Sequence, residues 1–143
     1  MDWVLQAILP LKYLKILVMS ENNIRQMEAD DFKGESFILR VLEGIIRWIT
    51  TIRVGMESLD ELTLNHNKLE HLGAGFFRGL NSLTTLYIDH NHIQTVNKDA
   101  FEGLEDSLTS LTLAGNQIQE FPMLALRRIH SLHTLHLDNN KLS

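Results

Sequence analysis

The sequence predicts an α/β solenoid, in which similar chain turns stack in a curve. A parallel sheet would line the concave face, with loops and short helices on the convex face. Five segments share the pattern L-x-x-L-x-x-L-x-L-x-x-N-x-L with small deviations, and the last four asparagines are spaced by 24, 25 and 24 residues. The last four segments also hold the triplets LTL, LYI, LTL and LHL, in which the outer apolar residues alternate with a more polar one. A repeat of this length must stack on its neighbours to bury its apolar side.

The triplets predict short strands with one buried side, because successive side chains of a strand point to opposite faces. The asparagine of each repeat follows where the chain leaves the strand and turns inward. Its side-chain amide has N–H donors and a carbonyl acceptor, which can satisfy buried backbone groups of the turn. We therefore expect a ladder of stacked asparagines, formed by Asn22, Asn67, Asn91, Asn116 and Asn140.

The second half of each repeat, which returns the chain to the next strand, is also regular. Apolar residues recur there at two fixed offsets from the asparagine, and we expect them to stack as core on the convex side. The residues at the first offset are Met27, Leu72, Val96 and Phe121, and those at the second are Phe32, Phe77, Phe101 and Leu126.

The chain of 143 residues is long enough for one domain with a core and too short for two. We assign residues 1–143 to a single domain of about six repeats. These are 11–34, 36–55 (degenerate), 56–79, 80–104, 105–128 and 129–143 (incomplete). The chain stops directly after the last leucine of the pattern, so we expect a fragment of a longer solenoid whose uncapped ends could self-associate. A truncated, non-functional product is an alternative.

Residues 38–55, ILRVLEGIIRWITTIRVG, break the pattern. As a shortened repeat, they place Arg47 in the asparagine position and Gly44 in a leucine position, and both would weaken the stack. As a helix, their polar residues recur every three or four positions and leave one apolar face. The distance from Asn22 to Asn67 is close to two repeats and favours the degenerate repeat. Both alternatives stay open.

The repeats resemble the typical class of leucine-rich repeat proteins, whose repeats are about 24 residues long. The segments DDFKG, GFFRGL and DAFEGL are similar to the return segment of that class. The C-terminal half, residues 101–142, resembles chaoptin-like cell-surface adhesion proteins. The resemblance implies a protein-binding horseshoe that holds a protein ligand on its concave sheet, as part of a receptor or adhesion ectodomain.

The same resemblance implies that the parent protein is extracellular or at the cell surface. The chain itself has no cysteine, and its first residues are not typical of a signal peptide. An intracellular regulatory or scaffold protein built from leucine-rich repeats is therefore the alternative.

Other classes of function are disfavoured. The net charge of −5 argues against a nucleic-acid partner, and no apolar stretch is free enough of charge to span a membrane. No cofactor motif or nucleophile–base arrangement indicates an enzyme. His90 and His92 flank Asn91, but equivalent residues of adjacent repeats stack in a column instead of converging on a metal ion, so we expect no metal site.

The candidate binding residues lie beside the inward leucines of the predicted strands and just after them, on the concave face. This set is polar and mildly acidic, and Tyr87 and His136 are amphipathic anchors of the kind found in protein interfaces. A purely structural role is the alternative, because threonine and tyrosine also suit any exposed sheet face. The set is Glu61, Thr63, Asn65, Thr85, Tyr87, Asp89, Ser110, Thr112, Thr134, His136 and Asp138.

Overall fold

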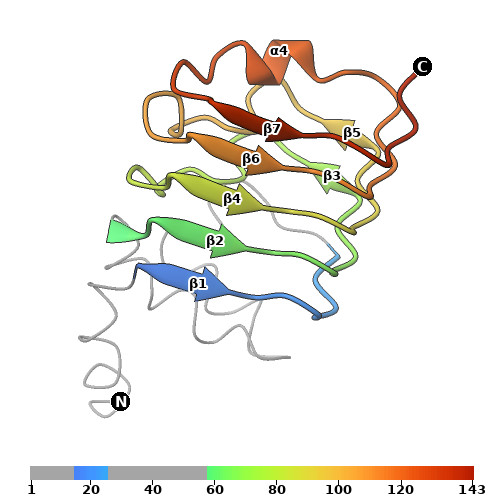
Figure 1. Cartoon of the computed structure of the whole chain (residues 1–143), viewed down its shortest axis with the longest axis horizontal. Helices are drawn as coiled ribbons and strands as arrows, with labels where there is room; N and C mark the ends of the chain where they lie inside the picture. The colour runs from blue at the N-terminus through green and yellow to red at the C-terminus, as the bar shows by residue number, and fades with distance from the viewer. Residues whose placement is uncertain (1–14, 26–57) are drawn as a thin grey trace.

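The computed structural model describes residues 15–25 and 58–143, and its main feature is a five-stranded parallel sheet (Figure 1). Its strands stack in the order β1-β2-β4-β6-β7. The bounds are Ile16–Val18 (β1), Glu61–Thr63 (β2), Thr85–Tyr87 (β4), Ser110–Thr112 (β6) and Thr134–His136 (β7). Strands β2, β4, β6 and β7 each contain the first two residues of a predicted alternating triplet, and the fold is the predicted repeat solenoid with a parallel sheet.

The return halves of the repeats carry less regular structure. Strands β3 (His71–Leu72) and β5 (Thr95–Val96) form a separate two-stranded parallel sheet. The following return half instead contains the short helix α4 (Met123–Leu126) (Figure 1). The two long sides of the stack therefore differ, since one is a continuous sheet and the other changes its structure from repeat to repeat.

The core lies between these two sides. The central leucine of each inner strand, namely Leu62, Leu86 and Leu111, is fully buried. On the return side, the rings of Phe77 and Phe101 stack with their centroids 5.9 Å apart and their planes 3° from parallel. Burial of each such side chain contributes about 1.5–3 kcal/mol relative to exposure.

The expected asparagine ladder is present. The Asn91 side-chain nitrogen donates to the backbone oxygens of Leu64 at 3.1 Å and Ile88 at 3.3 Å, which belong to adjacent repeats. The Asn91 side-chain oxygen accepts the backbone N–H of Leu69 at 3.2 Å. Asn67 makes the same set of bonds one repeat before, and Asn116 and Asn140 make it one and two repeats after. Among the described residues, the Asn22 side chain bonds only within its own turn, to Met19 O and Ser20 O. Each of the other four asparagines thus joins its own turn to the turn of the preceding repeat.

Phe121 does not join the core column that the sequence predicts, because 49% of its surface is exposed. In the preceding repeat, Asn97 N–H donates to Leu72 O at 2.8 Å and closes the rung between β3 and β5. The residue one repeat later is Pro122, which has no N–H to donate. The sheet on the return side therefore does not continue past β5, and Phe121 lies outside it.

Pro122 also turns the chain at this point. Its φ of −78° and ψ of 54° are close to an inverse γ-turn, and Met123 N–H donates to Phe121 O at 2.7 Å. Helix α4 begins directly after this turn. Leu126, at the second expected offset, is buried as predicted, so the repeat regains its core within five residues of Phe121.

Strand β1 pairs directly with β2, with Ile16 opposite Glu61. The next turn is joined in the same way, because Lys68 N–H donates to Ile24 O at 2.9 Å. Residues 36–55 lie outside the described part of the chain, and both alternatives for them stay predictions.

Candidate functional site

The side chains that flank the buried leucines form two rows on the outer face of the five-stranded sheet, the face that the repeat pattern predicts to be concave. The rows are fixed by the parallel register, which places equivalent residues of neighbouring strands side by side. The first row is Ile16, Glu61, Thr85, Ser110 and Thr134, and the second is Val18, Thr63, Tyr87, Thr112 and His136. Eight of the eleven predicted binding residues lie in these rows, which we call the concave surface. One of the eight, Thr112, is buried, with 8% of its surface exposed.

The concave surface is rigid at its base. Each row residue neighbours a leucine that points to the other side of the sheet, and Leu62, Leu86 and Leu111 have no exposed surface. Neighbouring strands in a sheet are about 4.8 Å apart, so the rows present a side chain at nearly regular intervals. Such a surface holds its polar and aromatic groups in place before any ligand arrives.

The remaining three predicted residues, Asn65, Asp89 and Asp138, come just after the strands. Asn65 Oδ1 accepts the backbone N–H of Asp89 at 2.6 Å, and Asp89 Oδ1 accepts that of Ala114 at 2.8 Å. Asp89 Oδ2 also accepts a hydrogen bond from the hydroxyl of Thr112 at 2.8 Å. Asn65 and Asp89 thus link successive repeats beside the asparagine ladder, and their binding role stays a prediction.

Charge on the concave surface is mainly negative. Lys15 and Asp60 form an ion pair of 3.4 Å at one border, where both side chains are largely exposed. Among the described residues, Glu61 has no ion-pair partner. His136 Nδ1 and Asp138 Oδ1 lie 3.6 Å apart at the other end of the rows. As a carboxylate within the first row, Glu61 favours a partner with basic groups.

The sequence-based set of binding residues omitted the apolar end of the rows. Ile16 is 55% exposed and Val18 is 63% exposed. They lie on either side of Leu17 in β1, as Glu61 and Thr63 lie on either side of Leu62 in β2. The repeat alignment already placed both residues in the same columns. Their position beside Glu61 gives the concave surface one apolar and one polar end.

The residue before each ladder asparagine forms another column. His66 and His90 have φ of 56° and 55°, and their rings stack with centroids 4.7 Å apart and planes 11° from parallel. The next residue in the column is Gly115, where a β-carbon would approach His90 Nδ1 to 2.5 Å. A side chain at position 115 would therefore require the His90 ring to move.

The described residues contain no group of three or more histidine, cysteine, aspartate or glutamate side chains that could hold a metal ion. Within the same part of the chain, no helix has the length and apolar character needed to cross a membrane.

Comparisons with known proteins agree with this geometry. Residues 57–118 match the family model described as leucine rich repeat. A chain in the crystal structure of the Drosophila melanogaster SNF/U2A' complex has the same fold, with a TM-score of 0.62 and 22% sequence identity. The match covers 89% of this chain and 59% of that one, so this chain spans less than two thirds of its length. No curated protein matches. Residues 57–118 thus match the leucine-rich repeat family, and the described fold is that of a leucine-rich repeat solenoid.

Proposed function

We propose that this leucine-rich repeat chain is a protein-interaction module that binds a protein ligand on its concave surface. The observation that carries the proposal is the pair of aligned rows over a fully buried leucine layer. Repeat solenoids use extended surfaces of this kind to bind partners. Because the rows are held by the sheet, little ordering is needed on binding, and this favours affinity.

The chemistry of the rows supports a partner with both apolar and basic groups. Ile16 and Val18 provide exposed apolar surface, and Tyr87 lies near the middle of the second row. Tyrosine is enriched among residues that dominate binding energy, because it offers a large apolar ring with a polar end. Glu61 lies beside the apolar residues and favours a lysine or arginine of the partner.

For the parent protein, we propose a cell-surface receptor or adhesion ectodomain. The resemblance of residues 101–142 to chaoptin-like adhesion proteins supports this part of the proposal. The alternative is an intracellular regulatory or scaffold protein. The similarity to the Drosophila chain, at 22% identity, supports the fold and does not favour the cell-surface assignment. Labelling of intact cells with a membrane-impermeant biotin reagent separates the two, because only a surface-exposed parent protein is labelled.

Quantitative capture experiments test the binding surface. The wild-type chain is compared with the double variant Thr63→Arg/Thr85→Arg, which places bulk and positive charge in both rows. A return-side control, Glu70→Lys beside β3, changes charge at an exposed position on the other long side of the stack. We expect at least one protein to be retained by wild type and by the control but lost from the double variant. Equal retention by all three chains would overturn the proposal.

A further inference from the structure

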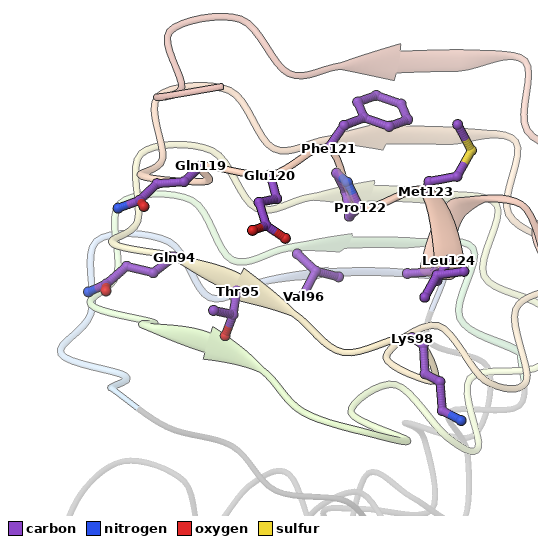
Figure 2. Close-up of a pocket in the computed structure, with 11 residues that line it drawn as sticks. Gln94, Thr95, Val96, Lys98, Gln119, Glu120, Phe121, Pro122, Met123 and Leu124 are labelled. Carbon is purple, nitrogen blue, oxygen red and sulfur yellow. The ribbon is translucent and has the colours of Figure 1, made fainter. Parts of the chain in front are cut away.

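A groove of about 490 Å³ opens on the return side of the repeats, away from the concave surface. One wall is β5 with its neighbours Gln94 and Lys98, and the other is the segment 119–125 (Figure 2). Its volume lies in the range of protein pockets that bind small molecules or side chains, roughly 300–1,000 Å³. The groove exists because the chain leaves the sheet at Pro122, as described above.

The first wall offers backbone hydrogen-bonding groups. β5 belongs to a two-stranded sheet with β3, and among the described residues no strand pairs with its second side. The segment that would have paired there, ending at Phe121, is turned away because Pro122 cannot donate the hydrogen bond that Asn97 donates in the preceding repeat. An unpaired strand edge is a template for another extended segment.

The second wall is unusually apolar for an exposed surface. Met123 is 58% exposed and Leu124 is 53% exposed, and both line the groove together with Val96. Methionine adapts its shape to different partners because its side chain is unbranched and flexible. An apolar side chain of a partner would therefore be buried between Val96 and Leu124.

Charged groups stand at two places along the groove. Figure 2 shows the Glu120 carboxylate directed toward Thr95 and Val96, and Lys98 at the opposite end, beyond Leu124. Neither Glu120 nor Lys98 has an ion-pair partner among the residues that the structure describes. One negative and one positive charge at separate positions define both the composition and the direction of a complementary segment.

We propose that this groove docks an extended segment of another protein, which adds a strand to the free edge of β5. The segment carries a basic side chain opposite Glu120, an apolar side chain between Val96 and Leu124, and an acidic side chain toward Lys98. In strand addition of this type, main-chain hydrogen bonds provide the affinity, and contacts of every second side chain of the added strand provide the specificity. The site uses no residue of the concave surface, so it is a second interaction surface.

A library of short random peptides displayed on phage tests the proposal. The library is selected on the wild-type chain, and the enriched peptides are then measured against single variants by fluorescence anisotropy. We expect enrichment of peptides in which a basic, an apolar and an acidic residue occur at alternate positions. The variant Leu124→Asp, at an exposed position, should weaken their binding about tenfold or more, and Glu120→Lys should do the same. Unchanged binding to both variants would overturn the proposal.

Three controls make the result specific. Tyr87→Ala, on the concave surface, should bind the peptides as wild type does, and equal loss there would contradict a separate site. Circular dichroism and the thermal midpoint show that each variant stays folded. A selected peptide N-methylated at the residues that bond to β5 should lose binding, whereas full retention would rule out strand addition. A library that yields no binder above an unrelated leucine-rich repeat protein would also overturn the proposal.

Discussion

The two long sides of the solenoid are built from the same repeat, yet only the strand side is regular. Every described repeat contributes a strand in the same register to the five-stranded sheet, and an asparagine closes each turn. On the return side, β3 and β5 pair, but the next repeat forms α4. A single residue, Pro122, accounts for the change. The secondary structure of the return side thus depends more on whether each repeat can supply the same backbone hydrogen bond than on the repeat's apolar pattern.

The largest expected effect contrasts two phenylalanines of the return side. Phe101 is 3% exposed and stacks on Phe77, whereas Phe121 is about half exposed. Phe101→Ala should lower the free energy of unfolding by about 3–5 kcal/mol, because it leaves a cavity. Phe121→Ala should change it by less than about 1 kcal/mol. Urea denaturation of both variants measures the difference. Similar losses would show that Phe121 belongs to the core after all.

The asparagine ladder should come second in magnitude. Asn91→Leu keeps the approximate volume but removes the acceptor of Leu69 N–H, whereas the Leu64 and Ile88 carbonyls keep their bonds from Asn67 and Asn116. A buried group left without a partner costs about 1–3 kcal/mol, so we expect a loss of that size in unfolding free energy. The exposed residue His92 next to it is the control, and His92→Leu should stay within about 0.5 kcal/mol. Equal losses of unfolding free energy in the two variants would show that the asparagine ladder does not stabilise the fold.

Pro122→Asn tests the account of the break directly. The new N–H should be able to donate to Val96 O, as Asn97 does to Leu72 O. The new hydrogen bond would raise the free energy of unfolding by about 0.5–1.5 kcal/mol. Replacing proline also gives the unfolded chain more conformational freedom, which would lower the free energy of unfolding by about 0.4–1 kcal/mol. The net change in stability should be small, but the amide of residue 122 should exchange slowly with solvent. Fast exchange there would mean that Pro122 is not what ends the sheet.

The smallest effect is expected from the ionic links between return segments. Arg78 and Glu102 form an ion pair of 2.5 Å whose side chains are about one-third exposed. Because solvent and salt screen such pairs, Glu102→Gln should lower the free energy of unfolding by less than about 1 kcal/mol. The difference from wild type should shrink further at high salt. A larger, salt-independent loss would point to a packing role for Glu102.

Much of the strand side could be predicted from the sequence, because the alternating triplet and the asparagine are repeated and each has one physical role. The ladder, the parallel register and the positions of the row residues follow from that repetition. The return side could be predicted only in part. Phe77, Phe101 and Leu126 are in the core as expected, but Phe121 is not, since an apolar match says nothing about the missing N–H of Pro122.

The candidate site was predicted to a similar extent. Its rows followed from the repeat, but the structural use of Asn65 and Asp89 did not, because side-chain bonds between repeats depend on the three-dimensional stack. The exposed apolar residues Ile16 and Val18 could have been predicted, because they occupy the same repeat positions as Glu61 and Thr63. The return-side groove was not, because it arises where the repeat pattern fails.

Hydroxyl-radical footprinting of the chain with a partner captured through the concave surface tests the central claim most directly. Tyr87 and His136 report on the rows, while Phe121 and Met123 are exposed on the return side and serve as internal controls. The account predicts lower oxidation of Tyr87 and His136 in the complex, with Phe121 and Met123 unchanged. Protection confined to Phe121 and Met123, or protection of neither pair, would contradict binding on the concave surface.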